Sequence, residues 1–247
     1  MPPRLFHAGD LNVGETVELT LIAGHHAARV LRAKTGDTVV LFNGKGGEYT
    51  AHIESIRKAA TIVTIDHFQT VERESPLTIE LAQALCVNEK MDLIIQKSVE
   101  LGVTHIQPIT TTRSIVRLPE DRAKKRFHHW QRVIIAACEQ CGRNSVPAIS
   151  PLISLTDWVG QRKRDISHHF SFMLSPTGNN CLTTIASSIS PTCLTLAVGP
   201  EGGLTADEET ILEQAGFLSL RMGKRILRTE TAALATIAAI QTHWGDF

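Results

Sequence analysis

The sequence predicts an α/β domain built on a parallel sheet and preceded by a small β-rich domain. From about residue 77 onward, short apolar runs alternate with helical segments, which is typical of a parallel sheet covered on both faces. Before residue 70, several short alternating strands are separated by turn residues, as in a small β-barrel. The polar segment 70–76 ends in a proline and is a plausible linker, so we divide the chain into residues 1–72 and 73–247.

Alternation of apolar and polar residues defines the elements of the first part. It predicts strands over residues 13–22, 38–42, 48–53 and 61–68. Asn43-Gly44 is a strong signal for a tight turn between two of them. One helical turn is predicted over residues 25–32, and it places Arg29 and Arg32 on one side.

The second part follows a strand-then-helix rhythm. Apolar runs predict strands over residues 77–84, 104–109, 170–174, 194–198 and 217–220. Helical patterns cover residues 89–101, 120–142, 155–163, 180–187, 205–216 and a last, Ala-rich segment that ends near residue 244. Thr205 and Glu208 form a capping box, and Gly102 and Gly216 are expected to end helices.

The bulk composition excludes several classes of protein. The chain has 247 residues, of which 43% are hydrophobic and 20% charged, and no apolar run is long enough to span a bilayer. The N-terminus lacks the apolar core of a signal peptide, so a cytoplasmic protein is expected. Five cysteines at irregular spacing argue against disulfides. Cys138 and Cys141 continue the apolar stripe of a predicted helix, and no metal site is expected there.

Positive charge gathers in one stretch although the net charge is zero. Residues 111–145 contain eight Arg or Lys against three acidic residues. Such a local excess suits a polyanion such as nucleic acid. The alternative is a solvated helix face.

Three loops that follow predicted strands are the candidate binding site. They cover residues 174–178, 199–203 and 220–232, and each contains glycine. Ligands in open α/β sheets bind beyond the carboxyl ends of the strands, and glycine lets the backbone approach a ligand closely. The loops suit a nucleoside-sized molecule, although the dinucleotide fingerprint Gly-x-Gly-x-x-Gly is missing. The alternative for 220–232 is an ordinary basic loop.

Residues with the chemistry of an acid or a base are few in these loops. Glu201 and Glu230 could act so, but a loop carboxylate can bond its own backbone, and Glu230 falls in the first turn of a helix, where the dipole favours an acid. No Gly-x-Ser-x-Gly is present, and no His is placed by the sequence beside a candidate nucleophile.

Several motifs, in order and over nearly the whole chain, resemble one family. They are Arg4-Leu5-Phe6, residues 26–32, Leu81 to Leu85, Lys90 to Val103, Thr112-Arg113-Ser114, Ala137 to Arg143, Gly199-Pro200-Glu201-Gly202-Gly203 and Met222 to Thr231. This pattern is similar to the bacterial methyltransferases that form N3-methyluridine in 16S ribosomal RNA. The last two motifs together are specific. Val87 and Asn88 depart from the family, which often has a basic residue there, and one RNA contact lacks its match.

The resemblance implies a fold and a cofactor. The family belongs to the SPOUT methyltransferases, in which the C-terminal loops form a trefoil knot around S-adenosylmethionine. A PUA-like β-barrel precedes that domain and helps to hold RNA. Members are homodimers, and the small residues of the last helix, such as Ala235 and Ala239, would allow close packing. The partners expected are therefore 16S RNA, or the small ribosomal subunit, and a second copy of the chain, with no metal and no membrane.

The resemblance also assigns roles to residues. Expected cofactor-binding residues are Leu174, Ser175, Pro176, Val198, Gly199, Pro200, Glu201, Gly202, Gly203, Met222, Gly223, Ile226, Leu227 and Thr231. Arg228 or Arg143 would stabilise charge on the uridine, and Glu201 or Glu230 is a weak candidate for the base. Phosphate contacts are expected from Arg4, Arg29, Arg32, Arg113, Arg117, Lys124 and Arg126.

Two other functions fit the same residues. A non-catalytic RNA-binding or ribosome assembly factor would keep the fold without binding S-adenosylmethionine. A SPOUT methyltransferase that acts on a different RNA would bind the cofactor equally well.

Overall fold

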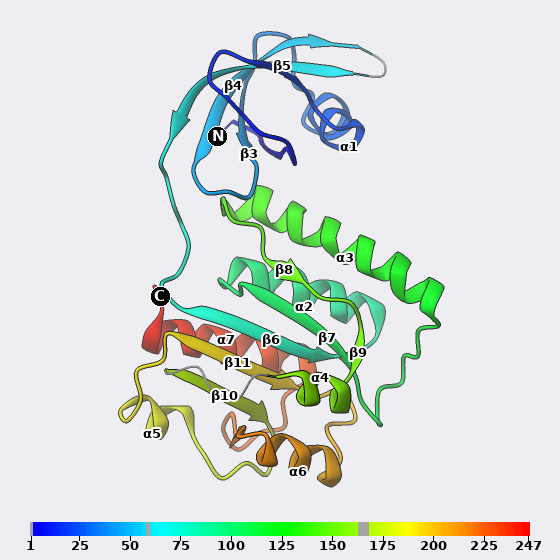
Figure 1. The fold of residues 1–247 in the computed structure, drawn as a ribbon, viewed down its shortest axis with the longest axis vertical. Helices are drawn as coiled ribbons and strands as arrows, with labels where there is room; N and C mark the ends of the chain where they lie inside the picture. Colours follow the sequence, from blue (N-terminus) through cyan, green and yellow to red (C-terminus); the bar gives the residue numbers. More distant parts are fainter. Residues whose placement is uncertain (1, 58–59, 163–167) are drawn as a thin grey trace. The chain divides into compact units, whose positions relative to one another are not determined.

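The structure is a computed structural model that describes residues 2–57, 60–162 and 168–247 (Figure 1). The chain forms two compact units. The first comprises Met1–Glu74 and Ile135–Val146, and the second comprises Ser75–Ile134 and Pro147–Phe247. The predicted division at residue 72 differs from these units chiefly by the segment Ile135–Val146. None of the helices in the described part of the chain has the length and hydropathy that a bilayer span requires.

The first unit is a five-stranded sheet in the order β1-β3-β4-β5-β2. β1 is parallel to β3, and the other neighbours are antiparallel. Alternate residues such as Leu41, Ile53 and Val63 point into a common core. The elements are β1 (Arg4–Phe6), β2 (Thr16–Glu18), α1 (Leu21–His25), the π-helical turn η1 (His26–Val30), β3 (Thr38–Phe42), β4 (Glu48–Ile56) and β5 (Thr61–Gln69).

Two predictions for this unit are wrong. The strand expected over residues 13–22 is confined to β2, because the Thr20 side chain accepts a hydrogen bond from the Ala23 backbone and starts α1. The helical turn expected to reach Arg32 ends at Val30, and Arg32 has a φ of 54°, in the left-handed region. Arg29 and Arg32 therefore do not share one helix face, and the side chain of Arg29 lies outside the described residues.

The second unit is a parallel sheet, as the sequence predicts, and it has seven strands where five were expected. Its order is β12-β10-β11-β6-β7-β8, with β9 also paired to β7. The strands are β6 (Thr78–Ala84), β7 (His105–Thr110), β8 (Ala148–Ile149), β9 (Ile153–Ser154), β10 (His169–Leu174), β11 (Cys193–Val198) and β12 (Leu218–Leu220). The two-residue strands β8 and β9 are too short to leave a periodic signal and were not predicted. A trefoil knot in this unit stays a prediction.

Helices cover this sheet (Figure 1). They are α2 (Asn88–Glu100), α3 (Glu120–Cys141), whose last turns belong to the first unit, α4 (Leu155–Gln161), α5 (Leu182–Ala186), α6 (Ala206–Gln214) and α7 (Thr229–Trp244). The capping box at Thr205 and Glu208 is present, which confirms the predicted start of α6. Gly102 has a φ of +85° and ends α2 as expected.

One apolar core joins α4 and α6 to the sheet. Ala82, Met173 and Ala197 of the strands pack there with Trp158 and Leu212 of the helices. α7 packs on α2 and α5 within the same chain. Ala233 is buried by this packing, whereas Ala235 is exposed. Packing within the chain thus accounts for part of the small-residue pattern of α7, and a homodimer stays a prediction.

A polar network lies at the amino-terminal ends of the strands. Glu80 of β6 accepts hydrogen bonds from Arg162 (2.8 Å) and from the Thr195 hydroxyl (2.9 Å), and the His105 ring lies 3.4 Å away. The Arg162 guanidinium also stacks on the rings of Trp158 and Phe217. Burial alone would raise the pKa of Glu80, but the His105 contact, the charge of Arg162 and the Thr195 hydroxyl outweigh it and lower the pKa to about 2.

This depressed pKa predicts how the stability of the second unit depends on pH. The ionised Glu80 stabilises the fold fully above pH 4.5, its ordinary pKa, and that contribution is lost as the pH falls toward 2. We expect Glu80→Gln to lower the free energy of unfolding at pH 7 by about 3 kcal/mol, with a smaller difference at pH 3. Urea titrations followed by tryptophan fluorescence report on this unit, because Trp130, Trp158 and Trp244 all lie in it. An equal loss at both pH values would contradict the assigned role of Glu80.

Candidate active site

A cavity of about 460 Å³ opens at the carboxyl ends of three adjacent strands. β10, β11 and β12 end at Leu174, Val198 and Leu220, and the loops that follow them supply most of its walls. We call it the strand-end cavity. Its lining consists of Arg113, Leu174–Thr177, Val198–Leu204, Ala206, Glu209, Leu220–Gly223, Arg225–Leu227, Thr229 and Ala232. The volume lies within the range of roughly 300–1,000 Å³ that is usual for small-ligand sites.

The loops after β10 and β12 are joined through their backbones. Ser175 N donates to Leu220 O (3.0 Å), and Arg221 N donates to Asn180 O (2.9 Å). Gly178 is pressed against the same strand, since a Cβ added there would lie 2.8 Å from the carbonyl carbon of Leu220. Glycine is therefore required at this position for the two loops to approach each other.

The loop after β11 is held from two sides. The Thr229 hydroxyl at the start of α7 donates to Gly199 O (2.7 Å) and accepts from the Gln83 amide (3.2 Å). Arg113 donates to Gly202 O (3.1 Å) and Leu204 O (3.0 Å). These bonds fix the loop that forms one wall of the strand-end cavity.

Nearly all of the expected cofactor-binding residues line this cavity. Thr231 does not, because α7 turns by about 100° per residue and presents Thr229 and Ala232 to the cavity instead. Its assignment stays a prediction without support from the lining. Arg113, expected to contact phosphate, is exposed and donates to carbonyl oxygens of the loop after β11, and its contact with RNA stays a prediction.

The glycines of the cavity leave room for a ligand. Gly203 and Gly223 have φ values of +70° and +79°, and a Cβ added to either would meet nothing within 4 Å. The backbone at these two glycines can therefore approach a bound molecule closely. The described residues contain no group of three or more potential metal ligands.

The two candidate bases are both paired with one lysine. Lys90 Nζ of α2 lies 3.3 Å from Glu201 Oε1 and 3.7 Å from Glu230 Oε2. Glu201 Oε1 also accepts from Val87 N (3.2 Å). Burial would raise the pKa of Glu201, but its own backbone, Val87 N–H and Lys90 hold that pKa below its ordinary value. A carboxylate with a lowered pKa is a weak base, which argues against Glu201 as proton acceptor.

The two candidate cations have different environments. Arg228 is exposed, directly precedes α7, and has no side-chain hydrogen bond or ion pair within the described part of the chain. Arg143 is only 5% exposed and belongs to the first unit, where Glu74 holds its guanidinium. Arg143 is therefore occupied by a structural ion pair, and its catalytic role stays a prediction.

Some of the residues expected to contact RNA have exposed side chains, and others are held by partners inside the protein. Arg4 is occupied inside the first unit: it pairs with Glu48, donates to Asn144 Oδ1 (2.6 Å) and lies over the Phe42 ring. Arg32, Arg117 and Lys124 are exposed, and Lys124 forms a surface pair with Glu120 (2.7 Å). Arg126 is half-buried.

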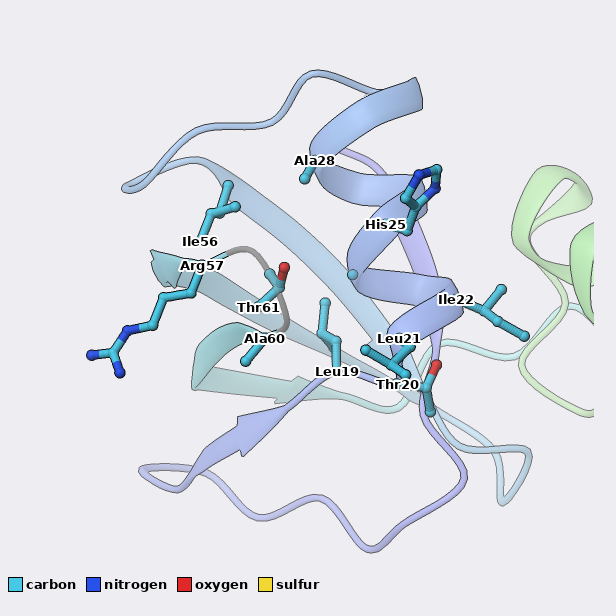
Figure 2. Close-up of a pocket in the computed structure, with 11 residues that line it drawn as sticks. Leu19, Thr20, Leu21, Ile22, His25, Ala28, Ile56, Arg57, Ala60 and Thr61 are labelled. Atoms are coloured by element: carbon cyan, nitrogen blue, oxygen red, sulfur yellow. The ribbon is translucent and has the colours of Figure 1, made fainter.

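A second cavity, of about 720 Å³, lies in the first unit (Figure 2). Its walls include Leu19, Leu21, Ile22, Ile56 and Arg57. In Figure 2 the Arg57 guanidinium points away from the other lining side chains. Although this cavity is larger, it is mainly aliphatic and is not formed by strand-end loops. We therefore place the site in the strand-end cavity.

Three residues of the site, or in contact with it, are not among the site residues predicted from the sequence: Lys90, Thr177 and Thr229. Thr177 and Thr229 line the cavity, and Lys90 holds a lining carboxylate. Thr177 directly follows the predicted residues Leu174 to Pro176, and this adjacency is the signal that points to it. Lys90 lies more than one hundred residues before Glu201, and its contact depends on the tertiary fold.

Comparison with known proteins identifies relatives for both parts of the chain. Residues 73–241 match the family described as RNA methyltransferase domain, and residues 23–65 match the RNA methyltransferase PUA domain. The chain is 33% identical to the ribosomal RNA small subunit methyltransferase E of Buchnera aphidicola subsp. Schizaphis graminum, over 99% of this chain and 97% of that protein. It is 33% identical to the enzyme of the same name from Bacillus subtilis, over 87% of this chain and 86% of the relative.

Two similar solved structures contain a bound cofactor. A methyltransferase of Legionella pneumophila in complex with SAM is 37% identical, with a TM-score of 0.94 over 100% of both chains. A ribosomal RNA small subunit methyltransferase E of Neisseria gonorrhoeae bound to S-adenosyl methionine is 42% identical, with a TM-score of 0.91 over 100% of both chains.

Proposed function

The chain belongs to the RNA methyltransferase family, and we propose that it transfers the methyl group of S-adenosylmethionine to N3 of a uridine in 16S ribosomal RNA. The observation that carries this proposal is the strand-end cavity, in which three glycine-containing loops meet at one edge of a parallel sheet. The cofactor bound by the Legionella and Neisseria proteins supports S-adenosylmethionine as its ligand.

The cavity fits this cofactor in size and in chemistry. Backbone N–H groups of the loops after β10, β11 and β12 can donate hydrogen bonds to a nucleoside, and their carbonyl oxygens can accept hydrogen bonds from it. The aliphatic side chains of Leu174, Val198 and Leu227 provide apolar walls, and Glu201 provides a carboxylate. The bound cofactor supplies an activated methyl group on a sulfonium.

The remaining chemistry belongs to the uridine. Its N3 carries a proton at neutral pH and must lose it before or during attack, which spreads negative charge onto the flanking carbonyl oxygens. The new bond forms between N3 and the methyl carbon, while the carbon–sulfur bond breaks and its electrons stay on sulfur. A cation beside those oxygens lowers the barrier, and exposed Arg228 is free to supply it.

Replacing Arg228 tests this assignment. We expect Arg228→Ala to lower turnover by about a hundredfold at saturating RNA and cofactor, as the loss of one transition-state donor does elsewhere. Lys224→Ala is the matched control for loss of a charge, because Lys224 is another exposed cation of the same loop; neither Lys224 nor Arg228 lines the cavity itself. Single-turnover methyl transfer measures both variants. Wild-type turnover in Arg228→Ala would exclude the role.

Exposed cations are the proposed contacts to the phosphate backbone. Arg32, Arg117 and Lys124 have side chains open to solvent, whereas Arg4 is held by internal partners. We propose that the first three contribute to RNA binding and that Arg4 stabilises the first unit. The PUA match over residues 23–65 supports an RNA-binding role for that unit.

Calorimetry with S-adenosylmethionine tests the proposed enzyme against a non-catalytic RNA-binding factor. Binding at one site per chain, lost when the strand-end cavity is altered, supports the proposal. No binding at millimolar cofactor would favour the non-catalytic factor.

A further inference from the structure

Three charged side chains form a part-buried cluster beside the strand-end cavity. Lys90, Glu201 and Glu230, here called the Lys90 cluster, come from α2, the loop after β11 and the first turn of α7. Their side chains are 30%, 21% and 15% exposed. The atom Glu230 Oε2 is buried without a hydrogen-bond partner in the described structure.

The cluster carries a net negative charge. With both carboxylates ionised and Lys90 protonated, the sum is −1. The Cys86 thiol is also close, but burial, followed by the charge of Glu201, raises its pKa to about 12, so it stays neutral. Of the other charged residues that line the cavity, Arg113, Arg221 and Arg225 are exposed, where solvent and salt screen their charges, and Glu209 is half-buried. The Lys90 cluster is therefore less screened than these exposed cations.

Glu201 connects this charge to the cavity. It lines the cavity directly, and Thr229, the neighbour of Glu230, lines it too. Methyl transfer changes the charge of the ligand held there, because the sulfonium becomes a neutral thioether when sulfur keeps the electrons of the broken bond. The ligand in the cavity therefore carries one more positive charge before the reaction than after it.

We propose that the Lys90 cluster discriminates S-adenosylmethionine from its demethylated product, S-adenosylhomocysteine, by charge. This inference rests on the proposed function. The cluster attracts the sulfonium more than the thioether, and it therefore favours release of the product. Lys90 is a positioning residue, because it holds Glu201 in place. It also limits the preference for the sulfonium, because its positive charge offsets one of the two negative charges.

Affinities for both ligands test the proposal. Calorimetry measures the ratio of the S-adenosylhomocysteine Kd to the S-adenosylmethionine Kd in each variant. Glu201→Gln removes a negative charge and should lower this ratio by about fivefold to tenfold, the size expected for one charge across a part-buried site. Lys90→Met leaves both carboxylates unbalanced and should raise the ratio by a similar factor. The double variant restores the net charge and should return the ratio toward that of the wild type.

A matched control separates charge from structure. Glu100→Gln removes the same charge from the pair that Glu100 forms with Lys97 (2.7 Å) at the far end of α2, and it should leave the ratio unchanged. Circular dichroism checks that all variants are folded. If both Kd values shift together and the ratio stays within twofold of wild type in Glu201→Gln and Lys90→Met, the cluster is only structural and the inference is wrong. If wild-type protein binds neither ligand, the proposed function itself fails.

Discussion

Replacing Gly178 with alanine is expected to weaken S-adenosylmethionine binding by roughly tenfold to a hundredfold, the equivalent of about 1–3 kcal/mol of overpacking. The added Cβ would lie 2.8 Å from Leu220 C, 2.9 Å from Ser219 Oγ and 3.0 Å from Arg221 N. Two of these atoms are backbone and cannot rotate away. The loops after β10 and β12 must then separate, and the walls of the strand-end cavity move apart.

Gly160→Ala is the matched control for this prediction. Gly160 lies in α4, and a Cβ added there meets nothing within 4 Å. Alanine in a helix is favoured over glycine by roughly 0.5–1 kcal/mol, so this variant should bind the cofactor normally and be slightly more stable. Calorimetry and urea unfolding measure both effects. Wild-type affinity in Gly178→Ala would show that the cofactor does not depend on these two loops.

Removing the carboxylate of Glu74 is expected to destabilise the first unit by about 3–5 kcal/mol. Arg143 donates from Nε to both oxygens of Glu74, at 3.0 and 3.1 Å, and its side chain is only 6% exposed. Glu74→Ala would leave a buried guanidinium without its carboxylate, which costs far more than the pair contributes. Arg143→Ala should be destabilised as well, because the carboxylate loses its donor.

The same variants decide whether Arg143 is structural or catalytic. Joint replacement of Arg143 and Glu74 by methionine removes both charges and should recover much of the lost stability. Thermal unfolding followed by circular dichroism provides the comparison. A structural Arg143 predicts that Glu74→Ala and Arg143→Ala lose stability together. A fully stable Arg143→Ala that has lost turnover would instead support the catalytic assignment.

Local signals in the sequence account for much of the second unit. The capping box at Thr205, the glycine after α2 and the strand-helix alternation are each encoded within a few residues, and the structure confirms them. The three cavity loops were predictable for the same reason. In a parallel sheet, segments that follow strands gather at one edge whatever the order of the strands.

Contacts between residues far apart in the chain could not be predicted from the sequence. The missed start of α1 is a different case, because its cause is local: Thr20 accepts from Ala23 N, three residues later, and this cap overrides the alternation that predicts a strand. Arg4 is a predicted phosphate contact and Arg143 a predicted catalytic cation, yet Glu48 and Glu74, far away in the chain, hold them. Lys90 cannot be assigned to the site from the sequence, because only the fold brings it to Glu201 and Glu230.

The site of methylation is the most direct test of the account. The protein should be incubated with methyl-labelled S-adenosylmethionine and small ribosomal subunits from cells that lack the native modification. We expect label in 16S RNA at one uridine, as N3-methyluridine, which blocks base pairing and stops reverse transcription at that nucleotide. Mass spectrometry of the digested RNA identifies the base. Label on another base or another RNA, or no label although the cofactor binds, would contradict the proposed function.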